Sequence, residues 1–194
     1  FRISEGELKN FDIVGSVADA LFGLKGLDQK LKSGGEQVRE HESTRFDWVE
    51  GTFKMRENVL SLEGLQLRNI GTSKATDSDA LLEGKVYLKE QRLDMKGKVI
   101  LAKRHSEELA QDAEVVKALY NAEQRVVLPI TLKGNTKKPV VVLDTEYVLG
   151  AISRYYTRQG VGKLREQLGL PAETPEGEEN PGERLLRELF KKRE

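Results

Sequence analysis

The sequence predicts an α+β domain: a curved, mainly antiparallel sheet of about seven or eight strands, with helices packed on one face and at the ends. Three observations lead to this fold class. Runs of alternating apolar and polar residues come in pairs joined by short turn sequences, which is typical of β-hairpins. Other segments repeat apolar residues at helical spacing. One acidic, proline-rich stretch near the end separates a last short segment from the rest.

Length and composition limit the class of protein. The chain has 194 residues, 38% hydrophobic and 33% charged, which is enough for one domain with its own core. Lysine and arginine together number 32, as do aspartate and glutamate, so no basic excess favours a nucleic-acid partner.

The absence of cysteine excludes disulfides and fits an oxidising compartment as well as many cytosolic proteins. No run of about 18 apolar residues predicts a membrane span. Because the chain starts at Phe1, we expect a mature form or an excised piece, with any targeting segment outside it.

The first predicted elements are two short strands and a helix. Residues 1–3 and 7–14 read as strands turned at Ser4-Glu5-Gly6, because glycine suits a turn with positive φ. A helix follows over residues 16–32 with Ser16 as its N-cap, and Ser33-Gly34-Gly35 ends it. The apolar stripe of this helix consists of Val17, Ala20, Leu21, Leu24, Leu27 and Leu31.

Two hairpins are predicted next. Thr44–Arg56 and Val59–Ile70 alternate and reverse at Glu57-Asn58. The alternation slips by one residue at Glu63-Gly64, which predicts a β-bulge there. Ala80–Glu90 and Arg92–Lys103 form the second hairpin, with a tight turn near Glu90-Gln91.

The remaining elements alternate between helix and strand. A helix is predicted over residues 106–121, with Leu109, Ala113, Val116 and Tyr120 on one face. Strands follow at residues 126–133 and 139–144, and Pro129 predicts that the first is an edge strand or has a bulge. A helix is predicted over residues 145–168, with an apolar stripe of Val148, Ile152, Tyr156, Leu164 and Leu168.

The end of the chain predicts a linker and a docking helix. Residues 171–181 are acidic, rich in proline and poor in apolar residues, as in a linker. Residues 182–194 predict a short amphipathic helix, which is marginal in water on its own and must either dock on another surface or stay frayed. Its apolar side consists of Leu185, Leu186, Leu189 and Phe190.

No residue pattern carries enzyme chemistry, so the sequence predicts a non-enzymatic protein with no catalytic, cofactor-binding or metal-binding residues. His41 and His105 lie in or beside polar segments and are interpreted as isolated surface histidines. Asp77 and Asp79 lack the other ligands of a calcium loop and are interpreted as turn residues. Turn and edge roles are also predicted for the remaining aspartates near strands, which are Asp12, Asp47, Asp94 and Asp144.

The apolar faces of the alternating strands are the remaining candidate for function. They either build an ordinary core beneath the helices or leave a concavity open for an acyl chain. The residues predicted for this face are Phe53, Met55, Leu60, Leu62, Val86, Leu88, Leu93, Met95, Leu128, Ile130 and Leu132.

Four stretches carry a resemblance to a known family. The first three are Gly6-x-Leu8 followed by Asn10-Phe11-Asp12-Ile13; Thr44-x-Phe46-Asp47 with Gly51-Thr52-Phe53, Val59-Leu60 and Leu65-x-Leu67; and Leu82-Glu83-Gly84-Lys85-Val86-Tyr87-Leu88 with Leu93-Asp94-Met95. The fourth and most specific is Leu128-Pro129-Ile130-x-Leu132-x-Gly134-Asn135-Thr136-x-x-Pro139. In this order they resemble the C-terminal domain of the AsmA-like family, bacterial envelope biogenesis proteins related to bridge-like lipid-transfer proteins. Asn58 stands where the family usually has glycine, and asparagine tolerates the same left-handed conformation.

The resemblance implies a periplasmic domain of a protein anchored in the bacterial inner membrane by a segment outside this chain. It implies support of outer-membrane biogenesis by shielding or conducting phospholipid between membranes. The partners to expect are phospholipid, the upstream part of the same parent protein and an envelope protein, with no nucleic acid and no cofactor. The alternative is a closed structural module that caps the parent protein and docks an envelope partner.

Overall fold

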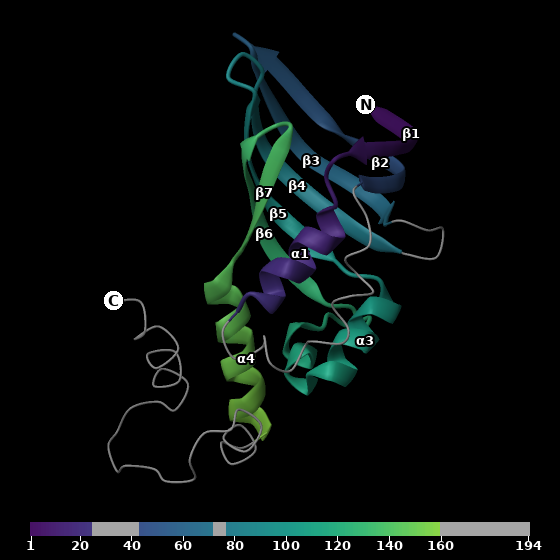
Figure 1. Ribbon diagram of the computed structural model, residues 1–194, viewed down its shortest axis with the longest axis vertical. Coiled ribbons are helices and arrows are strands. Elements are labelled where there is room, and N and C mark those ends of the chain that lie inside the picture. Colours follow the sequence, from purple (N-terminus) through teal and green to yellow (C-terminus); the bar gives the residue numbers. More distant parts are fainter. Residues whose placement is uncertain (25–42, 72–76, 160–194) are drawn as a thin grey trace, which may run out of the picture. The chain divides into compact units, whose positions relative to one another are not determined.

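The computed structural model describes residues 1–24, 43–71 and 77–159. Residues Phe1–Asp144 form one compact unit, and a second unit starts at Thr145. The first unit confirms the predicted fold class, because it is a seven-stranded antiparallel sheet with short helices (Figure 1).

Neighbouring strands in the sheet are consecutive in the chain, and the first and last strands form its two edges. Antiparallel neighbours need only short connections, which is why paired alternating runs predicted this meander correctly. The strands are β1 (Arg2–Lys9), β2 (Ser43–Arg56), β3 (Val59–Ile70), β4 (Ser78–Tyr87), β5 (Arg92–Ile100), β6 (Val127–Asn135) and β7 (Lys138–Leu143).

The N-terminal segment is one strand rather than the predicted pair of strands. Glu5, not Gly6, takes the left-handed conformation with φ 53°. The pairs Ser4–Trp48 and Gly6–Phe46 keep the same register across it, so β1 continues without a turn. Gly6 is required for a different reason: a Cβ there would lie 2.2 Å from the ring of Phe46.

Helix α1 (Ile13–Phe22) begins earlier than predicted, and the predicted strand over residues 7–14 is wrong at its end. Asp12, not Ser16, is the N-cap, because its Oδ1 accepts a hydrogen bond from the Gly15 amide at 2.9 Å. Ile13 and Val14 are β-branched and read as strand residues, but both are buried on the helix. The predicted helix beyond residue 24 lies outside the described residues.

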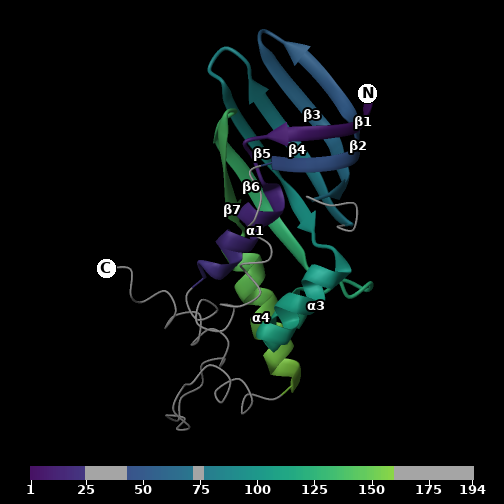
Figure 2. The same ribbon diagram turned by 45° about the vertical axis from the view of Figure 1, so that its right-hand side comes forward.

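Helix α1 lies on the concave side of the sheet, where it contacts β7 and β2 (Figures 1 and 2). In a flat sheet these two strands would be about 24 Å apart, since neighbouring strands are about 4.8 Å apart. A ten-residue helix is only about 15 Å long, so curvature of the sheet brings both strands within its reach. In both views α1 covers the half of the sheet that is remote from the β2–β3 and β6–β7 turns.

The predicted helix over residues 106–121 is two helices. α3 (Lys103–Asp112) ends at Ala113, whose extended backbone separates it from the 3-10 helix η1 (Glu114–Leu119). The Tyr120 hydroxyl donates to the carbonyl oxygen of Ser106 at 2.9 Å. This contact ties the end of η1 back to α3, which a single straight helix does not permit.

The hairpin turns are partly as predicted. Glu57 and Asn58 both have positive φ and form the predicted two-residue turn. The predicted bulge is confirmed by a register shift between Leu62 and Leu65 and by the left-handed Gly64. The second turn is not tight, because residues 88–91 form a four-residue connection.

The prediction for Pro129 is wrong, because β6 is an interior strand with no register shift at that residue. The Pro129 carbonyl accepts a hydrogen bond from the Asp144 amide at 3.0 Å, just beyond the last β6–β7 pair. The missing amide hydrogen of Pro129 faces the same side as its carbonyl. It would face Asp144, beyond the last residue of β7, so the proline falls at the end of this ladder and not within it.

Helix α4 (Thr145–Gln159) is the described part of the second unit. Val148, Ile152 and Tyr156 are buried, which confirms the predicted stripe over this range. The predicted helix beyond residue 159, the linker at 171–181 and the docking helix at 182–194 lie outside the described residues. No helix among the described residues is long and apolar enough to span a membrane.

Candidate functional site

Rows of apolar side chains run across the strands on the concave face of the sheet. Residues that pair directly across strands share a face, so the pairing register identifies these rows. The row nearest the hairpin turns consists of Met55, Leu60, Val86 and Leu93. The next row consists of Phe53, Leu62, Gly84, Met95, Leu132 and Val141. The third row includes Leu82, Gly97, Ile130 and Leu143.

Burial divides this face into a covered half and an open half. Leu128, Ile130 and Leu132 are at most 3% exposed, and Met95 is also buried, so these four predicted residues belong to the core. Phe53 and Met55 keep 52% and 63% of their surface exposed. Leu60, Leu62, Val86 and Leu93 are half-buried.

One residue predicted for the apolar face lies outside the strands, and two exposed apolar residues near the N-terminus were not predicted for that face. Leu88 lies in the β4–β5 turn and is exposed rather than placed in a strand row. Ile3 on β1 and Phe1 just before it are exposed apolar residues, and the Phe1 ring lies 5.6 Å from the Phe53 ring. The pairing of Ile3 with Val49, which pairs with Leu67, places it on the concave face. The alternation in β1 could have indicated this, had the segment been read as one strand.

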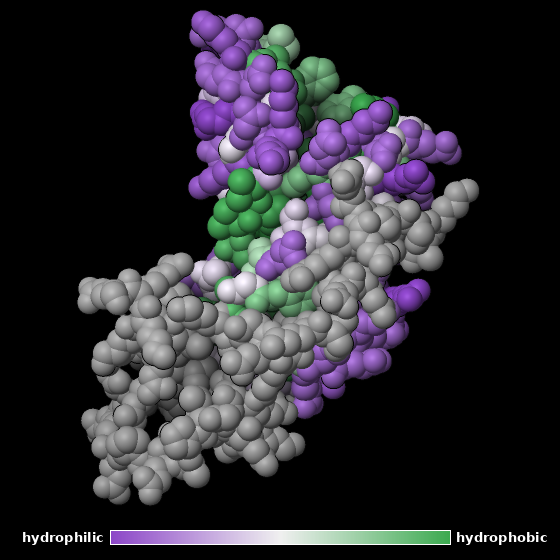
Figure 3. Space-filling model, viewed as in Figure 1, coloured by the Kyte–Doolittle hydropathy of each residue, from purple (hydrophilic) through white to green (hydrophobic). Residues whose placement is uncertain are grey.

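The opposite face of the sheet is predominantly polar. Lys54, Glu63 and Lys96 alternate with apolar concave-face residues and form exposed ion pairs such as Lys54–Glu63 and Glu83–Lys96. In Figure 3, hydrophilic residues cover the hairpin turns, and hydrophobic residues lie along β7. The exposed apolar residues of β7 are Val140 and Val142, which lie on this opposite face, whereas Phe53 and Met55 lie on the concave face.

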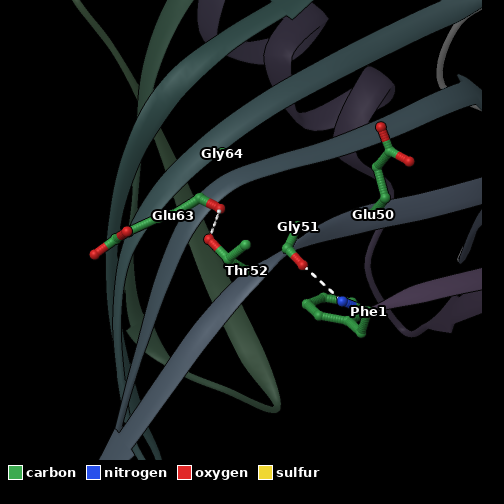
Figure 4. Close-up of a pocket in the computed structure, with 6 residues that line it drawn as sticks. All are labelled: Phe1, Glu50, Gly51, Thr52, Glu63 and Gly64. Atoms are coloured by element: carbon green, nitrogen blue, oxygen red, sulfur yellow. Dashed lines mark hydrogen bonds between the residues drawn. The ribbon is translucent and has the colours of Figure 1, made fainter.

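A shallow depression of about 480 Å³ lies beside the bulge between β2 and β3 (Figure 4). The Phe1 ammonium donates to the Gly51 carbonyl oxygen at 2.9 Å, and Thr52 Oγ1 donates to the Glu63 carbonyl oxygen at 3.2 Å. The side chains of Glu50 and Glu63 point in different directions (Figure 4). They do not converge on a common point, so the depression offers no acid/base pair.

A buried ion-pair network is the main polar feature that the sequence did not predict. Asp79, interpreted from the sequence as a turn residue, instead lies in β4 and is buried. Asp79 Oδ2 lies 3.1 Å from Arg125 Nη2 and 3.2 Å from Arg68 Nη1. Arg125 also donates to the carbonyl oxygens of Asp77, Ile100 and Leu101. The network joins the starts of β4 and β6 to the end of β5. Within the described residues, Arg125 donates its other hydrogen bonds to backbone carbonyl groups, which indicates a structural role.

His105 differs from its predicted surface position, because it is half-buried on α3. Its Nδ1 is buried and has no hydrogen-bond partner within the described ranges. Burial lowers the pKa of His105; Arg104 acts in the same direction, whereas Glu108 opposes it. His41 lies outside the described residues.

The lowered pKa of His105 predicts a loss of stability in mild acid. The unfolded chain binds a proton at His105 near pH 6.5 and the folded chain binds it only at lower pH, so stability falls as the pH drops below about 6.5. We expect the melting temperature to fall between about pH 7.5 and pH 5.5, and to fall less in His105→Gln. Thermal unfolding followed by circular dichroism measures this difference. Identical pH slopes in both proteins would contradict the assignment to His105.

The described residues contain no cluster of three or more histidine, aspartate or glutamate side chains that could hold a metal ion. Comparison with protein-family models, with curated proteins and with solved structures finds no match for this chain. The concave apolar face is thus the candidate site, and it is defined by its own geometry.

Proposed function

We propose that this chain is a non-enzymatic, AsmA-like periplasmic domain of a protein anchored in the bacterial inner membrane by a segment outside the chain. In this proposal the domain supports outer-membrane biogenesis by shielding or conducting phospholipid between the two membranes. The proposal combines the resemblance in sequence with the open half of the concave face.

The observation that carries the proposal is the exposure of the apolar residues on that face. Phe53 and Met55 are 52% and 63% exposed, whereas Leu128 and Ile130 on the same face are at most 3% exposed. An ordinary core buries all such side chains, since exposing a large apolar side chain forgoes about 1.5–3 kcal/mol. A curved apolar surface beside a closed core is suited to covering an acyl chain.

Glutamate at both Phe53 and Met55 is expected to abolish lipid binding while the domain stays folded. A carboxylate in contact with an acyl chain loses its hydration, which costs several kcal/mol. Because both side chains are exposed in the protein alone, the substitutions create no buried charge in the folded domain. Native mass spectrometry of protein purified without detergent, followed by lipid extraction, measures the bound phospholipid.

The matched control is Val142→Glu. This valine is 48% exposed on β7, but on the opposite face of the sheet. The control variant is expected to retain lipid. A lipid-free mass for the unsubstituted protein, repeated after incubation with phospholipid vesicles, would overturn the proposal.

One observation favours the alternative of an interaction module. Val140 and Val142 expose apolar surface on β7, which pairs only with β6 among the described strands. Such an edge can take an added strand from a partner. Photo-crosslinking from position 142 in the intact parent protein tests this function. A protein crosslink there, together with lipid-free protein, would favour the module.

A further inference from the structure

Three hairpin turns form one continuous end of the sheet. The Leu88 amide of the β4–β5 turn donates to the Asn58 carbonyl of the β2–β3 turn at 2.9 Å. The Thr136 amide of the β6–β7 turn donates to the Gln91 carbonyl at 2.8 Å. We call this end the tip band and define it as residues 54–61, 85–94 and 133–140. The register joins these ranges, because Ser61 pairs with Lys85, and Asp94 with both Lys85 and Lys133.

The tip band is strongly basic, although the whole chain has no net charge. It holds eight cationic side chains against the three carboxylates of Glu57, Glu90 and Asp94. Lys89, Lys137 and Lys138 have no ion-pair partner within residues 1–24, 43–71 and 77–159 and are exposed. The eight cations are Lys54, Arg56, Lys85, Lys89, Arg92, Lys133, Lys137 and Lys138.

Apolar side chains are exposed among these cations. Met55, Leu88 and Val140 are 63%, 44% and 57% exposed, one from each of the three hairpins. Arg92 stacks over the Tyr87 ring, with its guanidinium carbon 3.8 Å from the ring centroid. Exposed apolar groups surrounded by lysine and arginine are typical of surfaces that bind anionic membranes.

We propose that the tip band docks this domain on the surface of a bilayer that contains anionic phospholipid. Its cations complement the negative surface, and its apolar side chains enter the boundary between head groups and acyl chains. The inference extends the proposed function by naming the surface to which the open half of the concave face is presented. The inference rests on the proposed function only in what the docking is for. The charge of the tip band and the exposure of its apolar side chains are observed independently of that function.

A soluble polyanion is the competing partner for a basic surface. It would pair with the lysines but would gain little from Met55, Leu88 and Val140, because phosphate groups do not cover apolar surface. A bilayer uses both kinds of side chain. The joint presence of exposed cations and exposed apolar residues therefore favours the membrane.

Sedimentation with vesicles tests the docking. The full chain is expected to bind vesicles of 70% phosphatidylcholine and 30% phosphatidylglycerol at least about tenfold more tightly than pure phosphatidylcholine vesicles. Lys89→Gln with Lys137→Gln and Lys138→Gln is expected to weaken this binding at least about tenfold. The matched control, Lys98→Gln with Lys103→Gln and Lys117→Gln, removes the same charge outside the tip band and is expected to bind as the unsubstituted chain does. Circular dichroism confirms that each variant is folded.

A second variant separates a membrane from a soluble polyanion. Leu88→Ser with Val140→Ser keeps every charge and is expected to weaken vesicle binding several-fold, with no effect on retention by heparin. Any one of three results would overturn the inference. The chain could bind both vesicle types equally, the lysine variant and its control could lose vesicle binding equally, or the serine variant could bind vesicles as tightly as the unsubstituted chain. Lipid content by native mass spectrometry is measured on the same samples. Lipid-free protein that still binds anionic vesicles contradicts the proposed function and leaves the docking intact, whereas lipid-loaded protein that ignores the vesicles does the reverse.

Discussion

Replacing Asp79 by alanine is expected to lower the free energy of unfolding by about 3 kcal/mol. The Asp79 and Arg125 side chains are only 6% and 16% exposed, and the carboxylate also lies 3.2 Å from Arg68 Nη1. Removing the carboxylate leaves the Arg125 guanidinium largely buried without its buried counter-charge, because its other partner, Glu123, is 3.9 Å away and 72% exposed. Removing one partner of a buried ion pair is costly, because the desolvation of the remaining charge is no longer offset by attraction to its partner. Urea denaturation measures the loss.

The matched control for Asp79→Ala is Glu83→Ala. Glu83 pairs with Lys96 at 3.2 Å on the same sheet, but both side chains are more than half exposed. Its removal is expected to cost no more than about 0.5 kcal/mol. Asp79→Ala combined with Arg125→Met is expected to cost less than the sum of the two single substitutions, because the double variant leaves no unpaired buried charge, and the double-mutant cycle gives the coupling between the two residues. Equal costs for Asp79→Ala and Glu83→Ala would refute a stabilising role for the network.

Replacing Gly97 by alanine is expected to destabilise the fold by about 3 kcal/mol or to prevent folding. A Cβ at residue 97 would lie 1.9 Å from the Leu81 carbonyl oxygen and 2.9 Å from the Leu82 Cα. Both contacts are with the backbone of β4, the neighbouring interior strand, so no side-chain rotation relieves them. The two strands would have to separate at the centre of the sheet. Thermal unfolding and the yield of soluble protein measure the effect.

Gly64→Ala is the comparison for Gly97→Ala. Gly64 has φ 59°, and a Cβ there would meet nothing within 4 Å. Alanine at this position therefore bears only the cost of the left-handed conformation, about 1 kcal/mol. If Gly97→Ala were no more harmful than Gly64→Ala, the close approach of β4 and β5 would not be the reason for glycine at residue 97.

The strands of the sheet could be predicted from the sequence because their signals are local. Alternation from residue 44 to residue 70 fixed the β2–β3 hairpin, and Asn58 and Gly64 marked its turn and bulge. Helix starts were less predictable, because Asp12 and Ser16 are both good caps and only the burial of Ile13 and Val14 selects the first. The break at Ala113 depends on the tertiary contact from Tyr120 to Ser106, which no local pattern reports.

The candidate site was predictable as a face but not as an open surface. The alternation that places Phe53 on the concave face places Ile130 there too, yet one is 52% exposed and the other 3%. Ile130 lies on the interior strand β6, whereas Phe53 lies near the β2–β3 turn, and the difference in their exposure depends on tertiary packing that alternation does not report. Asp79 and Arg125 were missed for a similar reason, because 46 residues separate them in the chain.

The position of α1 also has a consequence for the order of folding. Every strand pairs with its chain neighbours, so the hairpins can form one after another as the chain emerges. Helix α1 ends at residue 22, but its partner β7 begins only at residue 138. During synthesis its apolar side must therefore stay without that partner until more than a hundred further residues have appeared. Packing of α1 against β7 must therefore follow the appearance of β7, and until then the side of α1 that meets β7 is exposed to aggregation.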